Sequence, residues 1–213
     1  MDKYLKINED VSLRYRKDIV DNAKAVILIN HGFAEHIGRY EYVKDKLNDN
    51  GFSVYRYDLR GHGKTKSKKG HIDSYKYFIS DCNSMVDLII EENPDKKVFM
   101  LGHSMGGLVT CLYGIDYPNK LSGQIFSGPA VGTLPPVEGI KGKALKLLSR
   151  IMPNKKIKNV VEDKICSNKE VVEDYKNDPL VLKEATSKFY REFLIEAVSY
   201  VDENISKYTY PCL

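Results

Sequence analysis

Residues 98–107, VFMLGHSMGG, join a short apolar run to a serine that stands between glycines. The apolar residues at 98–101 are typical of a buried strand, and the residues from 105 to about 117 predict a helix that ends before Pro118. Gly102 to Gly106 fit the pattern G-x-S-x-G, in which a serine on a tight turn between strand and helix holds its hydroxyl above the sheet. Ser104 is therefore the candidate nucleophile, and a glycine-rich turn without chemistry is the alternative.

Segments typical of strands and helices alternate on both sides of this motif. Residues 25–29, AVILI, form a continuous apolar run that predicts a central strand, whereas 11–16, VSLRYR, alternate between apolar and polar and are expected at an edge. Further strands are expected at 52–57 and about 124–127, and helices at about 40–47 and 75–90. The alternation predicts an α/β fold with a mostly parallel sheet flanked by helices.

Beyond residue 130 the alternation stops. Residues 131–207 are expected to form helices and loops, with an apolar stripe between Ile140 and Ile151 and a second helix at about 187–202. Tyr210 to Leu213 are typical of a strand that is just beginning. The predicted division is a core at 1–130, a helical cap at 131–207, and the start of a return to the sheet at 208–213.

The segment Asn30-His31-Gly32-Phe33 directly follows the predicted central strand. In a fold with a nucleophile elbow, this loop supplies one amide of the oxyanion hole, and the residue after the serine supplies the other. The main-chain amides of Phe33 and Met105 are therefore the candidate donors, each worth about 3–4 kcal/mol by analogy. For His31 we favour a structural role in the loop.

Three segments in this order, HGFAEHIGRY (31–40), YDLRGHGKT (57–65) and GHSMGG (102–107), resemble the monoacylglycerol lipase and lysophospholipase family of α/β hydrolases. The resemblance extends to NDPLV (177–181) and SKYTYPCL (206–213) and so covers almost the whole chain. It implies an α/β-hydrolase fold with a helical cap and with the last strands of the sheet missing. It also implies Ser104 as nucleophile, with the amides of Phe33 and Met105 as the oxyanion hole and the middle segment as a structural turn.

The activity that this resemblance implies is hydrolysis of carboxylic esters such as monoacylglycerols or lysophospholipids, through an acyl-enzyme on Ser104. No cofactor and no metal is expected to take part. In this fold the catalytic acid and histidine follow the serine along the chain. All five histidines precede Ser104, namely His31, His36, His62, His71 and His103.

The missing histidine leads to two hypotheses. We expect that a C-terminal segment with the acid and the histidine is missing, and that these 213 residues alone hydrolyse esters poorly. The alternative is an inactive α/β-hydrolase fragment or pseudoenzyme that binds an acyl ligand or a protein partner.

Composition narrows the possible partners and the compartment. The 33 basic residues are nearly balanced by 29 acidic ones, so the net charge of +4 gives no case for nucleic-acid binding. The polar start and the lack of any run of ~18 apolar residues argue against a signal peptide or a membrane span. The four cysteines lack metal or redox spacing, so free thiols and a cytoplasmic location are expected.

One part of the predicted cap is strongly basic. Between residues 131 and 160 seven basic residues accompany a single acid, Glu138. Beside an apolar stripe, such a basic face suggests peripheral contact with anionic lipid. The alternative is a solvated helix face over the acyl pocket, which is favoured by the acids that follow, namely Glu162, Asp163, Glu170, Glu173, Asp174 and Asp178.

Overall fold

The computed structural model describes residues 1–132, 137–159 and 165–213. A six-stranded sheet forms the centre, in the order β1-β2-β4-β3-β5-β6. Its strands are β1 (Lys3–Lys6), β2 (Ser12–Asp18), β3 (Ala25–Asn30), β4 (Phe52–Tyr57), β5 (Val98–His103) and β6 (Gly123–Ser127). The four strands β4, β3, β5 and β6 run parallel, and β1 and β2 pair antiparallel at one end of the sheet. The mostly parallel α/β sheet that the sequence predicts is confirmed.

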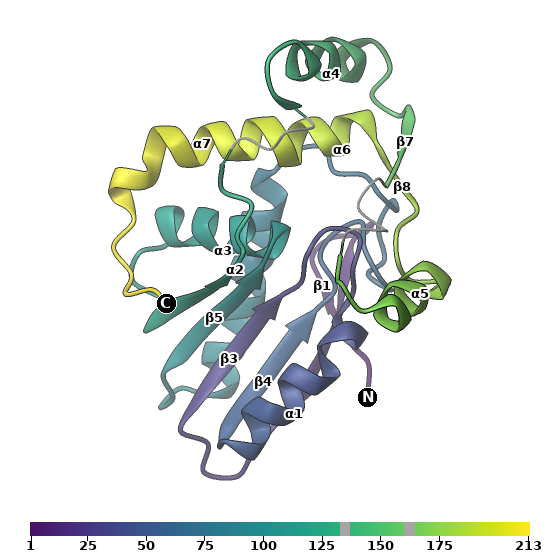
Figure 1. Ribbon diagram of the computed structural model, residues 1–213. Coiled ribbons are helices and arrows are strands. Elements are labelled where there is room, and N and C mark those ends of the chain that lie inside the picture. The colour runs from purple at the N-terminus through teal and green to yellow at the C-terminus, as the bar shows by residue number, and fades with distance from the viewer. Residues whose placement is uncertain (133–136, 160–164) are drawn as a thin grey trace.

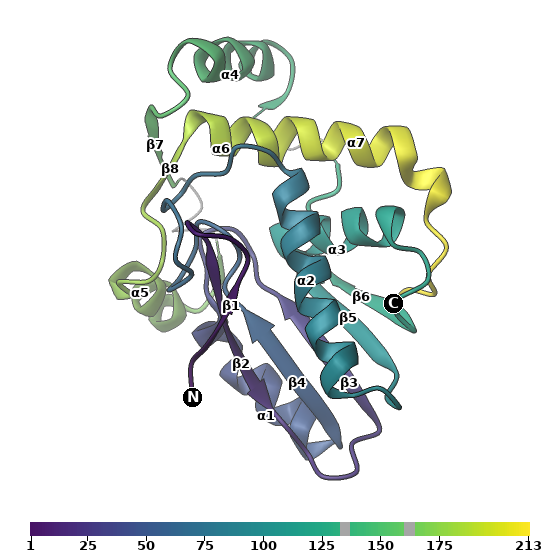
Figure 2. The ribbon, with the colours of Figure 1, turned by 180° about the vertical axis from the view of Figure 1, so that it is seen from behind.

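Helices cover both faces of this sheet. α1 (Glu41–Asp49) follows the short 3-10 helix η1 (Ile37–Tyr40) on one face, and α2 (Lys76–Glu92) and α3 (Met105–Asp116) lie on the other (Figures 1 and 2). Alternate residues of β3 point to opposite faces of the sheet and pack against the helices on each face. Ile27 and Ile29 pack in the cluster on the α1 side, whereas Val26 and Leu28 join the larger core with α2 and α3. All six residues of β3 are buried, which confirms 25–29 as a central strand.

One detail of the sheet differs from the sequence expectation. β2 was expected at an edge, but β1 pairs with it and takes the edge position, from Lys3↔Tyr15 to Lys6↔Ser12. Three of the four β1 residues are exposed, so this strand lacks the apolar pattern that would have predicted it. At the other edge the chain end pairs with β6, through Gln124 N to Pro211 O at 3.0 Å and Phe126 N to Leu213 O at 2.8 Å.

The region after β6 lies over the ends of the parallel strands at which the serine turn sits (Figure 1). Its first elements are α4 (Ile140–Ile151), β7 (Lys156–Lys158), α5 (Lys169–Asn177) and β8 (Glu184–Thr186). A continuous helix follows, made of α6 (Ser187–Arg191), the π-helical η4 (Glu192–Glu196) and α7 (Ala197–Asn204), and the region ends with the 3-10 helix η5 (Ile205–Lys207). The antiparallel pair β7 and β8 is an element that the expectation of helices and loops missed. The domain boundaries at 130 and 207 stay predictions.

Two further observations concern the chain as a whole. In the described residues no helix is long and apolar enough to span a bilayer. All four cysteines are free, with Cys82 and Cys111 buried. The cytoplasmic location stays a prediction.

Candidate active site

Ser104 occupies a strained turn between β5 and α3. Its backbone has φ 51° and ψ −116°, a conformation that side-chain-bearing residues rarely adopt. Three hydrogen bonds hold the turn: Ser104 N donates to Ser127 O at 3.1 Å, and Ser104 O accepts from the amides of Leu108 at 3.1 Å and Ala130 at 3.0 Å. The serine residue is half-buried. The sharp strand-to-helix turn that the motif predicts is therefore present.

The glycines around Ser104 make the turn possible. A Cβ atom on Gly102 would lie 2.3 Å from Thr110 Oγ1 and 2.4 Å from Gly106 O. A Cβ atom on Gly106 would lie 2.1 Å from Asn30 O, which is the last residue of β3. These contacts are too short for any side chain, so the elbow requires glycine at both positions. The second contact also shows that the elbow and the loop after β3 lie against each other.

This close approach brings the two candidate oxyanion amides to the same side of the sheet. Met105 is the first residue of α3, so its amide has no acceptor within the helix. Phe33 lies in the loop after β3, outside any helix or strand. Within the described residues neither amide donates a hydrogen bond to a protein acceptor. Two unpaired donors beside a serine hydroxyl could stabilise an oxyanion, and their assignment stays a prediction.

The ring of His31 connects the loop after β3 to the segment at Leu59. The ring is buried, and its Nε2 atom accepts a hydrogen bond from Leu59 N at 2.9 Å. The proton is therefore on Nδ1, which donates to Gly32 O at 2.8 Å. Burial lowers the pKa of His31, although the nearby Asp58 carboxylate opposes that shift. Both ring nitrogens thus hold the loop in place, in agreement with the structural role expected from the sequence.

Asp58 ties the segment YDLRGHGKT to the same loop. Its buried carboxylate accepts hydrogen bonds from Ile37 N at 2.8 Å, Lys64 N at 2.7 Å and Arg14 Nη1 at 3.0 Å. Gly63 has φ +45°, and a Cβ atom there would lie 2.3 Å from the carboxylate. The segment is a turn wrapped around Asp58, as the resemblance implied for it.

Contacts from the region after β6 hold the loop after β3, which carries Phe33. His36 Nε2 lies 2.7 Å from Asp178 Oδ2, and Leu182 N donates to Ala34 O at 3.0 Å. Ala34 has φ 65°, a conformation that costs about 1 kcal/mol or more and persists only where contacts hold it. The conformation of the residue next to Phe33 thus depends on a segment about 145 residues later in the chain. We call residues 178–182 the clamp.

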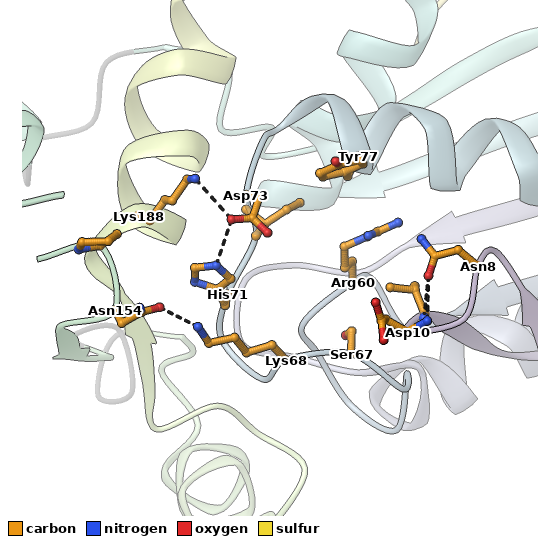
Figure 3. Close-up of a pocket in the computed structure, with 13 residues that line it drawn as sticks. Asn8, Asp10, Arg60, Ser67, Lys68, His71, Asp73, Tyr77, Asn154 and Lys188 are labelled. Carbon is orange, nitrogen blue, oxygen red and sulfur yellow. Dashed lines mark hydrogen bonds and ion pairs between the residues drawn. The ribbon is translucent and has the colours of Figure 1, made fainter. Parts of the chain in front are cut away.

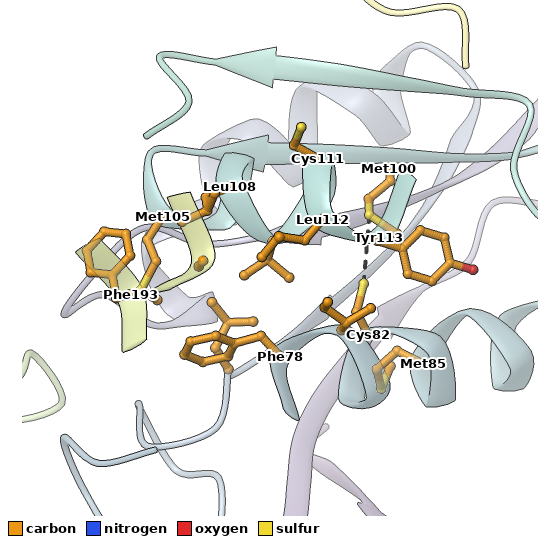
Figure 4. Packing of buried hydrophobic residues seen from close by; sticks show 14 of the residues in the cluster. Phe78, Cys82, Met85, Met100, Met105, Leu108, Cys111, Leu112, Tyr113 and Phe193 are labelled. Atoms are coloured by element: carbon orange, nitrogen blue, oxygen red, sulfur yellow. Dashed lines mark hydrogen bonds between the residues drawn. The ribbon is translucent and has the colours of Figure 1, made fainter. Parts of the chain in front are cut away.

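An aromatic cluster covers the loop. The ring of Phe33 packs at centroid distances of 5.6 Å from Phe189, 5.4 Å from Tyr190 and 5.9 Å from Phe193. Phe193 also lies beside Met105 in the buried core (Figure 4). The wall next to Ser104 is therefore apolar and aromatic, which suits an acyl chain more than a charged substrate.

None of the five histidines is placed as a base for Ser104. His103 directs Nδ1 to Ser127 O at 2.9 Å, and His36 binds Asp178. His62 is buried with Nδ1 3.1 Å from Arg60 O, and His71 contacts Thr186. Among the described residues no side chain forms a hydrogen bond with the Ser104 hydroxyl. They also contain no cluster of metal-binding side chains.

A separate cavity of about 510 Å³ opens between the 60–73 loop and the start of α6, and Ser104 does not line it (Figure 3). Several of its charged groups are paired with neighbours. Lys188 pairs with Asp73 at 3.2 Å, and Arg60 binds Asp81 with two hydrogen bonds. Nothing in this lining resembles a catalytic constellation.

Sequence reasoning named Ser104, Met105 and Phe33 as candidate site residues, and their roles stay predictions, but it missed the groups that hold these segments in place. The two partners His36 and Asp178 are 142 residues apart in the sequence, and no local pattern predicts that they form a hydrogen bond. The only available signal was that NDPLV stood out as a segment similar to the family, without a role. The buried Asp58 carried a signal of its own, because it stands in a turn rich in glycine.

The family described as serine aminopeptidase, S33 (Hydrolase_4) matches residues 21–213. A monoacylglycerol lipase of Mycolicibacterium smegmatis is 35% identical over 74% of this chain and 56% of its own length. The phospholipase YtpA of Bacillus subtilis is 34% identical over 82% of this chain and 67% of its own length. The crystal structure of the Paleococcus ferrophilus monoacylglycerol lipase superposes with a TM-score of 0.81 at 28% identity, covering 94% of this chain and 75% of that one.

Proposed function

Because this chain belongs to the serine aminopeptidase, S33 family of α/β hydrolases, we propose that it carries the nucleophile and the oxyanion hole of a serine hydrolase for lipid-like acyl esters. The observation that carries the proposal is the strained Ser104 at the elbow, packed against the loop that bears the unpaired Phe33 amide. The names of the two relatives, a monoacylglycerol lipase and a phospholipase, support a lipid ester as substrate. Since the chain spans only about half of the mycobacterial relative, the activity of the whole protein is part of this proposal.

The proposed reaction begins with attack of Ser104 Oγ on the ester carbonyl carbon. As the C–O bond forms, the carbonyl oxygen becomes negative and is held by the amides of Phe33 and Met105. The serine proton passes to a base and then to the departing alcohol, which leaves an acyl-enzyme. Water, activated by the same base, then releases the fatty acid and restores the serine.

In the part of the chain that the structure describes, each of the five histidines bonds to a group other than Ser104, so none is in place as its base. We propose that a histidine and its acid come from a further segment. The parallel pairing of Cys212 with Gln124 supports this, because a chain that continues in that direction runs toward the C-terminal ends of the parallel strands, where Ser104 lies.

The same observation favours a second candidate, an inactive α/β-hydrolase module that binds an acyl ligand or a protein partner. A serine without a base is a weak nucleophile, while the aromatic wall next to it still offers an apolar site. The two candidates differ in one respect that can be measured: whether the Ser104 hydroxyl reacts once a base is present.

Added imidazole separates the candidates on this chain itself. With a short-chain p-nitrophenyl ester, the chain alone is expected to work near background, and imidazole is expected to raise turnover in the chain but not in Ser104→Ala. The matched control is Ser127→Ala, which removes a neighbouring hydroxyl and leaves the nucleophile in place. Equal turnover by the chain and Ser104→Ala at every imidazole concentration contradicts the hydrolase and leaves the binding module.

A further inference from the structure

The loop after β3 is held by hydrogen bonds to both polar groups of the Ile37 main chain. Ile37 N donates to Asp58 Oδ1 at 2.8 Å, and Ile37 O accepts from Arg56 Nη1 at 3.2 Å. The side chains of Asp58 and Arg56 are buried, with 0% and 1% of their surface exposed. Phe33, which bears one of the two candidate oxyanion amides, precedes Ile37 in the same loop. The position of this loop therefore depends on where the two buried charges are held.

The carboxylate of Asp58 is linked through an arginine to Asp2, which lies just before β1. Arg14 Nη1 donates to Asp58 Oδ2 at 3.0 Å, and Arg14 Nη2 donates to Asp2 Oδ1 at 2.9 Å. The Arg14 side chain is only 2% exposed, so its charge has to be balanced inside the protein. Among the described residues, Asp2 and Asp58 are the carboxylates that pair with it.

The guanidinium of Arg56 is linked to the same aspartate. Asp2 Oδ1 accepts from Arg16 Nε at 2.6 Å, and Arg16 Nη1 donates to Glu41 Oε1 at 2.9 Å. The same oxygen of Glu41 lies 3.1 Å from Arg56 Nη1. In both ribbon views the N-terminus lies beside α1, which begins with Glu41 (Figures 1 and 2). Two series of ion pairs thus lead from Asp2 to the amide and to the carbonyl of Ile37.

The charge of Asp2 keeps the two series in order. Burial raises the pKa of its carboxyl group, but hydrogen bonds from Arg14 and Arg16 outweigh burial and bring the pKa to about 2. Asp2 is therefore ionised at neutral pH. Without its charge, Arg14 Nη2 loses its acceptor and competes for Asp58 Oδ1, the oxygen that accepts from the Ile37 amide.

We propose that Asp2 is a positioning residue for the oxyanion hole, because its charge keeps Asp58 and Arg56 on the main chain of Ile37. This inference rests on the proposed hydrolase function. The family match begins at residue 21, so Asp2, β1 and β2 lie outside the part of the chain that it covers. The carbonyl oxygen of the substrate becomes negative only as the serine attacks, so a displaced amide is expected to slow turnover without weakening substrate binding.

Kinetics with imidazole and a short-chain p-nitrophenyl ester measure this effect. In Asp2→Asn the kcat is expected to fall about tenfold, while KM changes less than about twofold. Asp2→Glu keeps the carboxylate, so its kcat is expected to stay within about threefold of that of the unaltered chain. The matched control is Glu9→Gln, because Glu9 pairs with Lys6 between β1 and β2 but is 90% exposed. This control is expected to change neither constant, since an exposed ion pair contributes little.

Amide hydrogen exchange tests the same inference without turnover. In Asp2→Asn the Ile37 amide is expected to exchange at least about tenfold faster, whereas the amides of β5 exchange at an unchanged rate. An unchanged rate at Ile37, or an equal rise at Ile37 and in β5, overturns the inference, because the second result means that Asp2 acts only on global stability. An unaltered kcat in Asp2→Asn, or an equal loss in Glu9→Gln, also overturns it. A chain in which Ser104 does not react contradicts the proposed function instead, and exchange at Ile37 then decides whether Asp2 holds the loop.

Discussion

His36 and Asp178 are joined by a hydrogen bond of 2.7 Å that connects the loop after β3 to the clamp, residues 178–182. Gly38 N donates to His36 Nδ1 at 3.1 Å, so the ring proton is on Nε2 and the bond forms with a neutral imidazole. Burial raises the pKa of Asp178, but the hydrogen bonds from His36 and from the Leu180 amide outweigh it and the net shift is downward. The position of the Phe33 amide is thus linked to a contact made far along the chain.

Weakening the acceptor at position 178 is expected to loosen the loop after β3. Asp178→Asn leaves one acceptor oxygen for two donors, His36 Nε2 and the Leu180 amide. We therefore expect amide hydrogen exchange at residues 31–37 and 178–182 to rise at least tenfold, with a loss of about 1–3 kcal/mol in unfolding free energy. The matched control is Asp73→Asn, because Asp73 also contacts a histidine, His71, at 3.3 Å but is 66% exposed. That variant is expected to lose less than about 0.5 kcal/mol. Unchanged exchange in both segments of Asp178→Asn contradicts the clamp.

The elbow is expected to tolerate no side chain at Gly106. Gly106→Ala places a methyl group 2.1 Å from Asn30 O, so either the loop after β3 or the elbow must move. We expect a loss of about 3 kcal/mol or more in unfolding free energy, measured by urea denaturation. Gly132→Ala is the control, because a Cβ atom there meets nothing within 4 Å and its φ is not positive. A Gly106→Ala protein as stable as this control would show that the elbow and the loop do not touch.

The stability of the fold is expected to fall as the pH drops below about 6.5. Burial lowers the pKa of His31 and lowers that of His62 well below the ordinary value of 6.5. Between the lowered pKa and 6.5 the unfolded chain binds protons that the folded chain does not, so each histidine withdraws up to about 1.4 kcal/mol of stability per pH unit. Above pH 6.5 both histidines are neutral in the folded and in the unfolded chain, so they no longer lower the free energy of unfolding.

Thermal unfolding between pH 7.5 and 5.5 measures this dependence. In His62→Gln the slope is expected to be shallower, because one of the histidines whose pKa is lowered by burial is no longer present. The Nε2 atom of His62 has no hydrogen-bond partner, so the substitution removes only the contact of Nδ1 with Arg60 O. An identical slope in chain and variant would mean that His62 is not buried as a neutral ring.

The sequence predicts best what is local. The elbow is encoded within ten residues, VFMLGHSMGG, and the buried strands β3 and β5 carry continuous or nearly continuous apolar runs. β1, β7 and β8 have only three or four residues each, and β1 and β7 bury little. Their pairing is decided by neighbours that periodicity does not reveal.

The apolar stripe of α4 shows a second limit. Its periodicity predicted the helix, but the same pattern fits a stripe that faces a core and a stripe that faces outward, and the structure places Ile140 and Leu147 outside. The clamp shows a third limit. His36 and Asp178 meet only after the chain between them has folded, so neither residue is recognisable alone.

The central claim is that the hydroxyl of Ser104 reacts as a nucleophile at the elbow. Mass spectrometry after treatment with a fluorophosphonate in the presence of imidazole tests it most directly. The account predicts a single adduct on the peptide that contains Ser104, formed faster with imidazole and absent from Ser104→Ala. An adduct on a different serine, or none at any imidazole concentration from a chain that is folded by circular dichroism, would contradict it.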